Sequence, residues 1–299
     1  MSSTTRCPRC GNEVRADFFV CAFCGKRLRI ERIENFSFFK RIETEWTTPD
    51  RWYTILLWLF IKPNKAFWSI NHRRKSAPGY FILLFNALLF GVMGIAYFSH
   101  FNIQDIPPLD FRIFIYNLVI FLAFFIFGFA YFFIFGFILI WLFTKGANYA
   151  VGFSEKLESF FGGSEREEYS EAEMSVFSIY KGGTLHQQQA FKYKMMFCSF
   201  APFLLINLIE IIIILAGFPT VPINVLGLFN PTIFSQIFNS STWTVLHFID
   251  AVTIAIWIPI LVALSIRELS NSSTTRVLLS SLIIGILVAV IFFFLRPTF

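Results

Sequence analysis

Charge is scarce in this sequence of 299 residues. Only 15% of the residues are Asp, Glu, Lys or Arg, while 56% are hydrophobic and 19% are aromatic. A soluble domain usually carries about 25% charged residues. The 42 phenylalanines gather in runs such as FLAFFIFGFAYFFIFGF at 121–137, and a soluble chain of this size has no means of burying them. The composition therefore excludes an ordinary soluble protein and indicates a membrane protein.

The sequence also lacks the motifs of several enzyme classes. It contains no HExxH, no GxSxG and no P-loop. The 78 residues before the first long apolar stretch do not resemble a signal peptide, so we expect that stretch to direct the chain into the membrane. These absences favour a non-enzymatic membrane protein.

Five stretches are long and apolar enough to cross a bilayer core of about 30 Å, which requires about 20 helical residues. They are Gly79 to Phe98, Ile113 to Phe143, Met195 to Phe218, Trp243 to Ile266 and Val277 to Leu295. The second stretch is too long for one core width and too short for two spans, so we expect it to tilt or to continue past the membrane surface. The sequence thus predicts an all-α polytopic membrane domain with five transmembrane helices over residues 79–299.

The distribution of Lys and Arg predicts the orientation of these helices. Of the 25 basic residues, 23 fall before Gly79, between Lys145 and Lys194, or between the fourth and fifth stretches, and only Arg112 and Arg296 fall elsewhere. Basic residues favour the cytoplasmic side. We therefore expect a cytoplasmic N-terminus and a C-terminus that is outside or lumenal. The net charge of +6 then reflects topology and attraction to anionic lipids, not nucleic-acid binding.

Residues 31–78 are predicted to form a linker or short surface helix, followed by an interfacial helix. The apolar stretch Trp52 to Ile61 is too short to span, tryptophans and basic residues surround it, and Pro63 breaks it. A cytosolic helix packed on a partner is the alternative. A similar amphipathic segment is expected at 151–163, followed by a solvated acidic loop at 165–173.

The segment 219–242 has no charge and three prolines, so we expect it to lie on the outer surface or to re-enter the membrane. Asn239 begins a glycosylation sequon on that side.

Four of the five cysteines lie in the first 30 residues, in two Cys-x-x-Cys-Gly turns with ten residues between them. They are Cys7, Cys10, Cys21 and Cys24. Two such turns can close a tetrahedron of thiolates around a structural zinc ion, with an iron–sulfur centre as the other metal option. A disulfide pair or a redox motif is the non-metal alternative, and a cytoplasmic location disfavours disulfides. We therefore predict a zinc ribbon at residues 1–30 that binds a cytoplasmic protein. The fifth cysteine, Cys198, is predicted to be a small core residue within a span.

Two carboxylates, Glu210 and Asp250, lie inside the predicted spans. Asn207 and His247 each precede one of them by three residues, about one helical turn. Because no Lys or Arg lies at that depth, we expect at least one carboxyl group to be protonated or bonded to His247. This intramembrane polar cluster either holds two helices together through hydrogen bonds or forms a path for protons or cations.

Several stretches resemble the Yip-domain family of Ypt/Rab-interacting membrane proteins. They are KPNKAFWSI at 62–70, FFGG at 160–163, GGTLHQQQAFKYKMMFCSFAPFLLINLI at 182–209 and WIPILVALSIRELSNSSTTRVLLSSLIIGIL at 257–287. The resemblance implies five spans, a cytoplasmic N-terminus and no catalysis. It is nearest to prokaryotic members that carry an N-terminal zinc ribbon. Eukaryotic members act in early secretory trafficking and associate with prenylated Rab-type GTPases, but their Asp-Leu-Tyr-Gly-Pro motif is absent here.

The sequence therefore favours a membrane scaffold or adaptor, surrounded by membrane lipids and bound through its ribbon to a cytoplasmic partner. A small GTPase is one partner that the resemblance leaves open, as are homo- and hetero-oligomers. The alternative is a small-solute or proton-coupled transporter or channel that uses Glu210, Asp250 and His247. Internal repeats would favour that alternative, and none is found.

Overall fold

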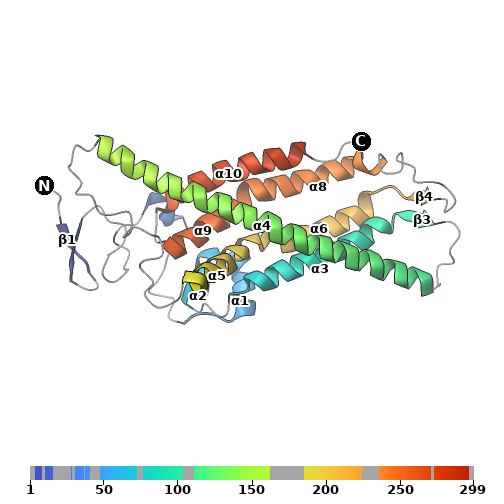
Figure 1. Ribbon diagram of the computed structural model, residues 1–299, viewed down its shortest axis with the longest axis horizontal. Helices are drawn as coiled ribbons and strands as arrows, with labels where there is room; N and C mark the ends of the chain where they lie inside the picture. Colours follow the sequence, from blue (N-terminus) through green and yellow to red (C-terminus); the bar gives the residue numbers. More distant parts are fainter. Residues whose placement is uncertain are drawn as a thin grey trace. The chain divides into compact units, whose positions relative to one another are not determined.

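The computed structural model describes residues 4–8, 11–15, 28, 31–36, 38–40, 48–72, 77–103, 111–161, 185–223, 236–270 and 273–295 (Figure 1). The strands are β1 (Thr4–Arg6), β2 (Glu13–Arg15), β3 (Phe101–Ile103) and β4 (Val221–Ile223). The helices before residue 180 are η1 (Arg32–Asn35), α1 (Trp52–Ile61), α2 (Pro63–His72), α3 (Gly79–Phe98) and α4 (Phe111–Phe161). The later helices are α5 (Leu185–Met196), η3 (Phe197–Phe200), α6 (Pro202–Gly217), α8 (Ser241–Val252), η4 (Thr253–Trp257), α9 (Ile258–Ser270) and α10 (Thr274–Phe294).

The chain divides into two compact units, and each is treated separately below. Unit 1 consists of Met1–Pro78, Ile140–Ser199 and Pro259–Ile284. Unit 2 consists of Gly79–Leu139, Phe200–Ile258 and Gly285–Phe299.

Five helical stretches are long and apolar enough to cross a membrane. They are Gly79–Phe98, Ile113–Ala150, Phe191–Gly217, Ser241–Leu269 and Thr274–Phe294. The prediction of five such helices is confirmed, with ends that shift by a few residues. The helices fit a multi-pass integral membrane protein.

The second span belongs to one very long helix. α4 has 51 residues, which corresponds to about 76 Å at about 1.5 Å per residue. The sequence from 109 to 201 contains no proline, so nothing in it forces the helix to stop where its apolar part ends near Ala150. The amphipathic segment predicted at 151–163 is therefore largely the continuation of α4, not a separate helix. The acidic stretch 165–173 lies outside the described residues.

In unit 1, α1 and α2 form the predicted broken helix. The break falls between Ile61 and Pro63, and Lys62 joins the two helices. α1 buries Ile55 and Leu59. Its opposite side exposes large apolar side chains, namely Trp52, Tyr53, Leu57 and Ile61. An exposed apolar face on a helix too short to span is what an interfacial helix requires.

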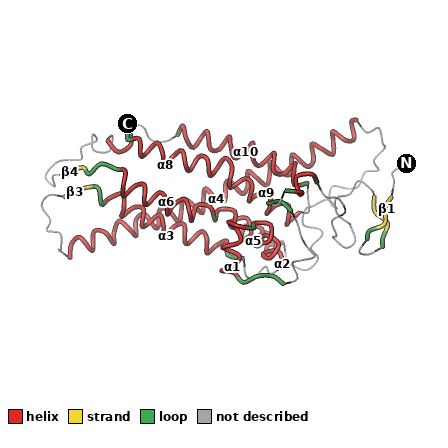
Figure 2. The backbone as a smooth tube through the Cα atoms, turned by 180° about the vertical axis from the view of Figure 1, so that it is seen from behind, coloured by secondary structure: helices red, strands yellow, loops and turns green. Residues whose placement is uncertain are grey.

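In unit 2, α3 and α6 run side by side, and α6 also contacts α8 (Figures 1 and 2). The short strand β3 follows α3 and pairs in parallel with β4, which follows α6, in the register Phe101↔Val221 to Ile103↔Ile223. The sequence analysis does not predict this strand pair. The pairing joins the ends of α3 and α6, so the loops that follow these two helices begin at the same end of unit 2. The predicted topology also places both loops on one side of the membrane.

Two of the spans are interrupted within their apolar stretch. The third span changes from α5 through the tight turn η3 into α6, which begins at Pro202. The fourth span contains one turn of π-helix, η4, directly before Pro259 in α9. Proline lacks the N–H that an α-helix uses, and its ring crowds the preceding turn. Both breaks therefore lie where the regular series of backbone hydrogen bonds cannot continue.

Candidate functional site

The first cysteine of the predicted ribbon lies in a tight hairpin. β1 and β2 are antiparallel, with Thr4 opposite Arg15. Between them the Gly11 N–H donates to the Cys7 carbonyl at 2.9 Å, and the Cys7 N–H donates to the Asn12 carbonyl at 2.9 Å. Gly11 has a φ of 72°, a left-handed conformation that favours glycine. The glycine after the Cys-x-x-Cys pair therefore closes the turn.

Cys7 is buried in this hairpin, where it packs with Val14 and Leu28. The other three predicted zinc ligands, Cys10, Cys21 and Cys24, lie outside the described residues. Among the residues that the structure does describe, no three His, Cys, Asp or Glu side chains gather as a metal site. The buried Cys7 and the tight turn that follows it fit a thiolate zinc knuckle.

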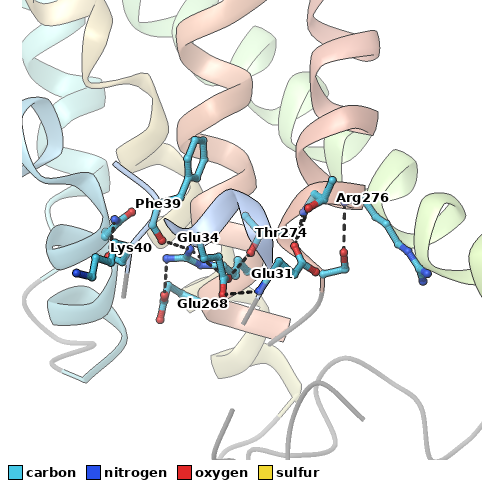
Figure 3. Close-up of polar contacts among 11 residues, drawn as sticks. Glu31, Glu34, Phe39, Lys40, Glu268, Thr274 and Arg276 are labelled. Atoms are coloured by element: carbon cyan, nitrogen blue, oxygen red, sulfur yellow. Dashed lines mark hydrogen bonds and ion pairs between the residues drawn. The ribbon is translucent and has the colours of Figure 1, made fainter. Parts of the chain in front are cut away.

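Unit 1 contains a second polar centre, built around Arg267 at the C-terminal end of the fourth span. Arg267 is 0% exposed. Its Nη1 donates to the Phe39 carbonyl at 3.0 Å and lies 3.7 Å from Glu34 Oε1, while its Nη2 donates to Glu268 Oε1 at 3.2 Å. Both carboxylates are buried as well. Figure 3 shows Glu34, Glu268 and the Phe39 carbonyl converging at this point.

The same segment reaches the start of α10. Thr274 Oγ1 donates to Glu34 Oε1 at 2.8 Å. The Thr275 N–H and its Oγ1 both donate to Glu31 Oε2, each at 2.8 Å. The first N–H groups of a helix have no partner within it and carry partial positive charge, so carboxylates at this end are favourable. Glu31 thus caps the first turn of α10 from a segment some 240 positions away in the chain, and Glu34 binds the Thr274 hydroxyl beside it.

Two further contacts, within unit 1, extend this arrangement to α2. Asn64 Nδ2 donates to the Lys40 carbonyl at 2.9 Å, and Asn71 Nδ2 donates to the Glu268 carbonyl at 3.1 Å. We call residues 31–40 the N-terminal arm, and the arm together with Arg267, Glu268 and Thr274–Arg276 the arm-docking cluster.

Only a weak signal for this cluster is present in the sequence. Residues 31–50 were predicted as a linker or short surface helix, and Arg267 was counted only as a basic loop residue. The structure instead buries Glu34 and Arg267 together. The available signal was local: an Arg-Glu pair ends an apolar span, and two glutamates three positions apart lie at 31 and 34. Their pairing is a long-range contact that no local pattern specifies.

The intramembrane polar cluster lies in unit 2. Glu210 of α6 is buried, and its carboxyl group shares a hydrogen bond with that of Asp250 in α8. The structure thus brings these two carboxyl groups together. Tyr131 of α4, which the sequence reasoning missed, lies within electrostatic range of both carboxyl groups.

Asn207, one turn before Glu210 on α6, bonds to a side chain of another helix. Its Nδ2 donates to Asn86 Oδ1 at 3.1 Å, and Asn86 Nδ2 donates to the Phe200 carbonyl at 3.4 Å. Asn86 and Asn207 are both buried. The chain of amides therefore ties α3 to α6 and reaches the break before Pro202.

The His247 ring lies among aromatic side chains. Its centroid is 4.6 Å from that of Trp243 and 5.8 Å from that of Phe292. Of the four predicted residues, the structure thus joins Glu210 to Asp250 and Asn207 to Asn86, and places His247 among rings.

Five apolar helices, two of them interrupted, with a carboxyl pair between two of the helices, fit the class of multi-pass integral membrane proteins. No family model matches this chain, and neither a curated protein nor a solved structure matches it significantly.

Proposed function

We propose that this protein is a non-enzymatic membrane scaffold or adaptor of the Yip type, which presents a cytoplasmic zinc ribbon to a protein partner in membrane trafficking or organisation. The docked arm carries this proposal. Residues 31–40 directly follow the ribbon, and Arg267 binds them to the helical part of unit 1. A ribbon attached to a docked arm is held close to the membrane domain, as an adaptor requires, and not on a long free tether.

The hairpin around Cys7 supports zinc as the metal. Cys7, Cys10, Cys21 and Cys24 would hold it, and the ion would supply folding energy to a module with little hydrophobic core. A site closed by four thiolates has no open coordination position, so it offers a binding surface and not a reaction centre.

Metal analysis of the purified full-length chain tests this part of the proposal. We expect about one zinc per chain, lost in a Cys7→Ser variant. Cys198→Ser is the matched control, because Cys198 is buried in a span, and it should retain the metal. Iron in place of zinc, or retention of zinc by Cys7→Ser, would contradict the assignment.

Partner capture tests the adaptor role. The full-length chain in nanodiscs would be compared with Cys7→Ser for binding of cytoplasmic proteins, with purified prenylated small GTPases as one defined set. We expect specific partners to be lost with the ribbon. If every partner binds both forms equally, the ribbon is not the binding surface and the proposal fails.

The second candidate function is a small-solute or proton-coupled transporter that uses Glu210, Asp250 and His247. The observation that favours it is the carboxyl pair between α6 and α8, next to two interrupted spans. Proton uptake by proteoliposomes, compared between the natural chain and Glu210→Gln, tests it. Uptake that is absent, or unchanged in Glu210→Gln, would exclude this role.

A further inference from the structure

We propose that Glu210 and Asp250 together form a binding site for one exchangeable proton inside the membrane-spanning part of unit 2. The inference holds for a scaffold as well as for a transporter, because it concerns what the pair binds and not what the protein moves. It is carried by the contact between the two carboxyl groups, by an unpartnered oxygen of Glu210 and by the absence of Lys and Arg from the helices that hold the pair.

The contact itself requires a proton. Two carboxylate groups are both acceptors, so they can share a hydrogen bond only when one of them carries a hydrogen. Two ionised carboxylates in contact would also repel each other strongly in a medium of low dielectric constant. The pair seen in the structure therefore corresponds to one proton and one negative charge, or to two protons.

The helices that hold the pair supply no Lys or Arg to neutralise that charge. α3, α6 and α8 contain neither Lys nor Arg. The part of α4 that belongs to unit 2 contains Arg112, which is 19 positions, about 28 Å of helix, before Tyr131. The titratable groups around the pair are Tyr131 of α4 and His247 of α8 itself. A phenol is neutral at ordinary pH, and His247 packs against two aromatic rings.

One carboxyl oxygen of Glu210 is buried without a hydrogen-bond partner among the described residues. The residue is 4% exposed, and its Oε1 has no hydrogen-bond partner among the described residues. Asn207, one turn earlier on the same helix, directs its amide N–H to Asn86. A buried acceptor without a donor is costly, and a proton, or a water that delivers one, relieves that cost.

The two members of the pair differ in access. Glu210 is enclosed by protein, whereas Asp250 is partly exposed at the surface of unit 2. α8 ends two residues after Asp250, and the π-helical turn η4 follows. The two carboxyl groups therefore differ in how far protein covers them.

An apolar carbodiimide tests the proposal, because it partitions into membranes and modifies protonated carboxyl groups there. The full-length chain in lipid vesicles would be treated over a range of pH, and the modified residues identified by mass spectrometry. We expect one adduct per chain, on Glu210 or Asp250, that decreases as the pH rises because the proton leaves. Glu268 is an internal control: it is buried in unit 1 but binds Arg267, so it should stay unmodified.

The variants and a cation complete the experiment. Glu210→Gln and Asp250→Asn should each remove or move the adduct, and the double variant should show none. No adduct on either residue of a folded chain would overturn the proposal, and so would an adduct independent of pH. Protection by sodium at constant pH would show that the site takes a metal cation instead of a proton, and would also overturn it. Proton binding without transport would leave this inference standing while excluding the transporter.

Discussion

Glu34 in unit 1 and Glu210 in unit 2 are buried to almost the same degree, at 3% and 4% exposure, yet their surroundings differ in kind. Glu34 lies beside a buried guanidinium and accepts from a threonine hydroxyl at the start of α10. Glu210 lies among apolar helices that contain no Lys or Arg, and it meets a second carboxyl group. The first arrangement holds its carboxylate by charge and by donors, whereas the second needs a proton.

This difference separates two uses of a buried acid. A paired ion is expensive to break, because removing one partner leaves the other charged and buried. A carboxyl group that is neutral, or that shares a proton, can be replaced by an amide of the same shape with little loss. We therefore expect unit 1 to depend on charge for its stability and unit 2 to depend on charge for a binding property.

The largest effect is expected for Arg267→Met. This change leaves Glu34 and Glu268 buried without their cation and removes the bond to the Phe39 carbonyl. We expect a loss of about 3–5 kcal/mol in the free energy of unfolding, measured by thermal or denaturant unfolding in detergent. Arg51→Met is the control, since Arg51 is exposed, and it should change stability by less than about 0.5 kcal/mol. Equal effects of the two changes would show that the arm-docking cluster does not hold unit 1 together.

A matched pair of substitutions sharpens the comparison. Glu34→Gln should cost about 1–3 kcal/mol, because the amide cannot balance the charge of Arg267. Glu210→Gln replaces an equally buried side chain and should cost less than about 1 kcal/mol, because the amide can still bond to Asp250. Both values come from the same unfolding assay. If Glu210→Gln is the more damaging change, the distinction between the two units is wrong.

The smallest effect concerns the amide contact between α3 and α6. Asn86→Leu and Asn207→Leu each remove the bond between the two side chains, so their effects should not add. We expect a coupling energy of about 0.6 kcal/mol from the double-mutant cycle, the typical size for polar contacts between membrane helices. Strict additivity would mean that the two amides act independently.

The sequence predicted the apolar framework well because it rests on local composition. Runs of about 20 apolar residues can satisfy their backbone hydrogen bonds in a membrane only as helices, so each of the five stretches was predicted to be a helix. The break at Pro63 followed from proline chemistry. The meeting of Glu210 and Asp250 was also predictable, since both lie at similar depth on successive spans.

The features that escaped prediction are long-range. The contact between Glu34 and Arg267 joins residues 233 positions apart. The strands β3 and β4 have three residues each, too few for an alternating pattern that would predict them. The bond from Asn207 to Asn86 also joins two helices, α6 and α3, so the spacing of Asn207 along its own helix does not reveal it. The zinc ribbon, the orientation of the chain and the use of Asn239 for glycosylation stay predictions.

We propose that the N-terminal arm docks on the cytoplasmic side of a five-span protein. Labelling of single cysteines tests it most directly, in a chain whose native cysteines are replaced by Ser. Phe36 in the arm and Thr220 before β4 are both exposed, so Cys at either position can react with a membrane-impermeant maleimide. In sealed, right-side-out membranes we expect Thr220→Cys to be labelled at once and Phe36→Cys only after lysis. Labelling of Phe36→Cys from outside, or of Thr220→Cys only after lysis, would contradict the account.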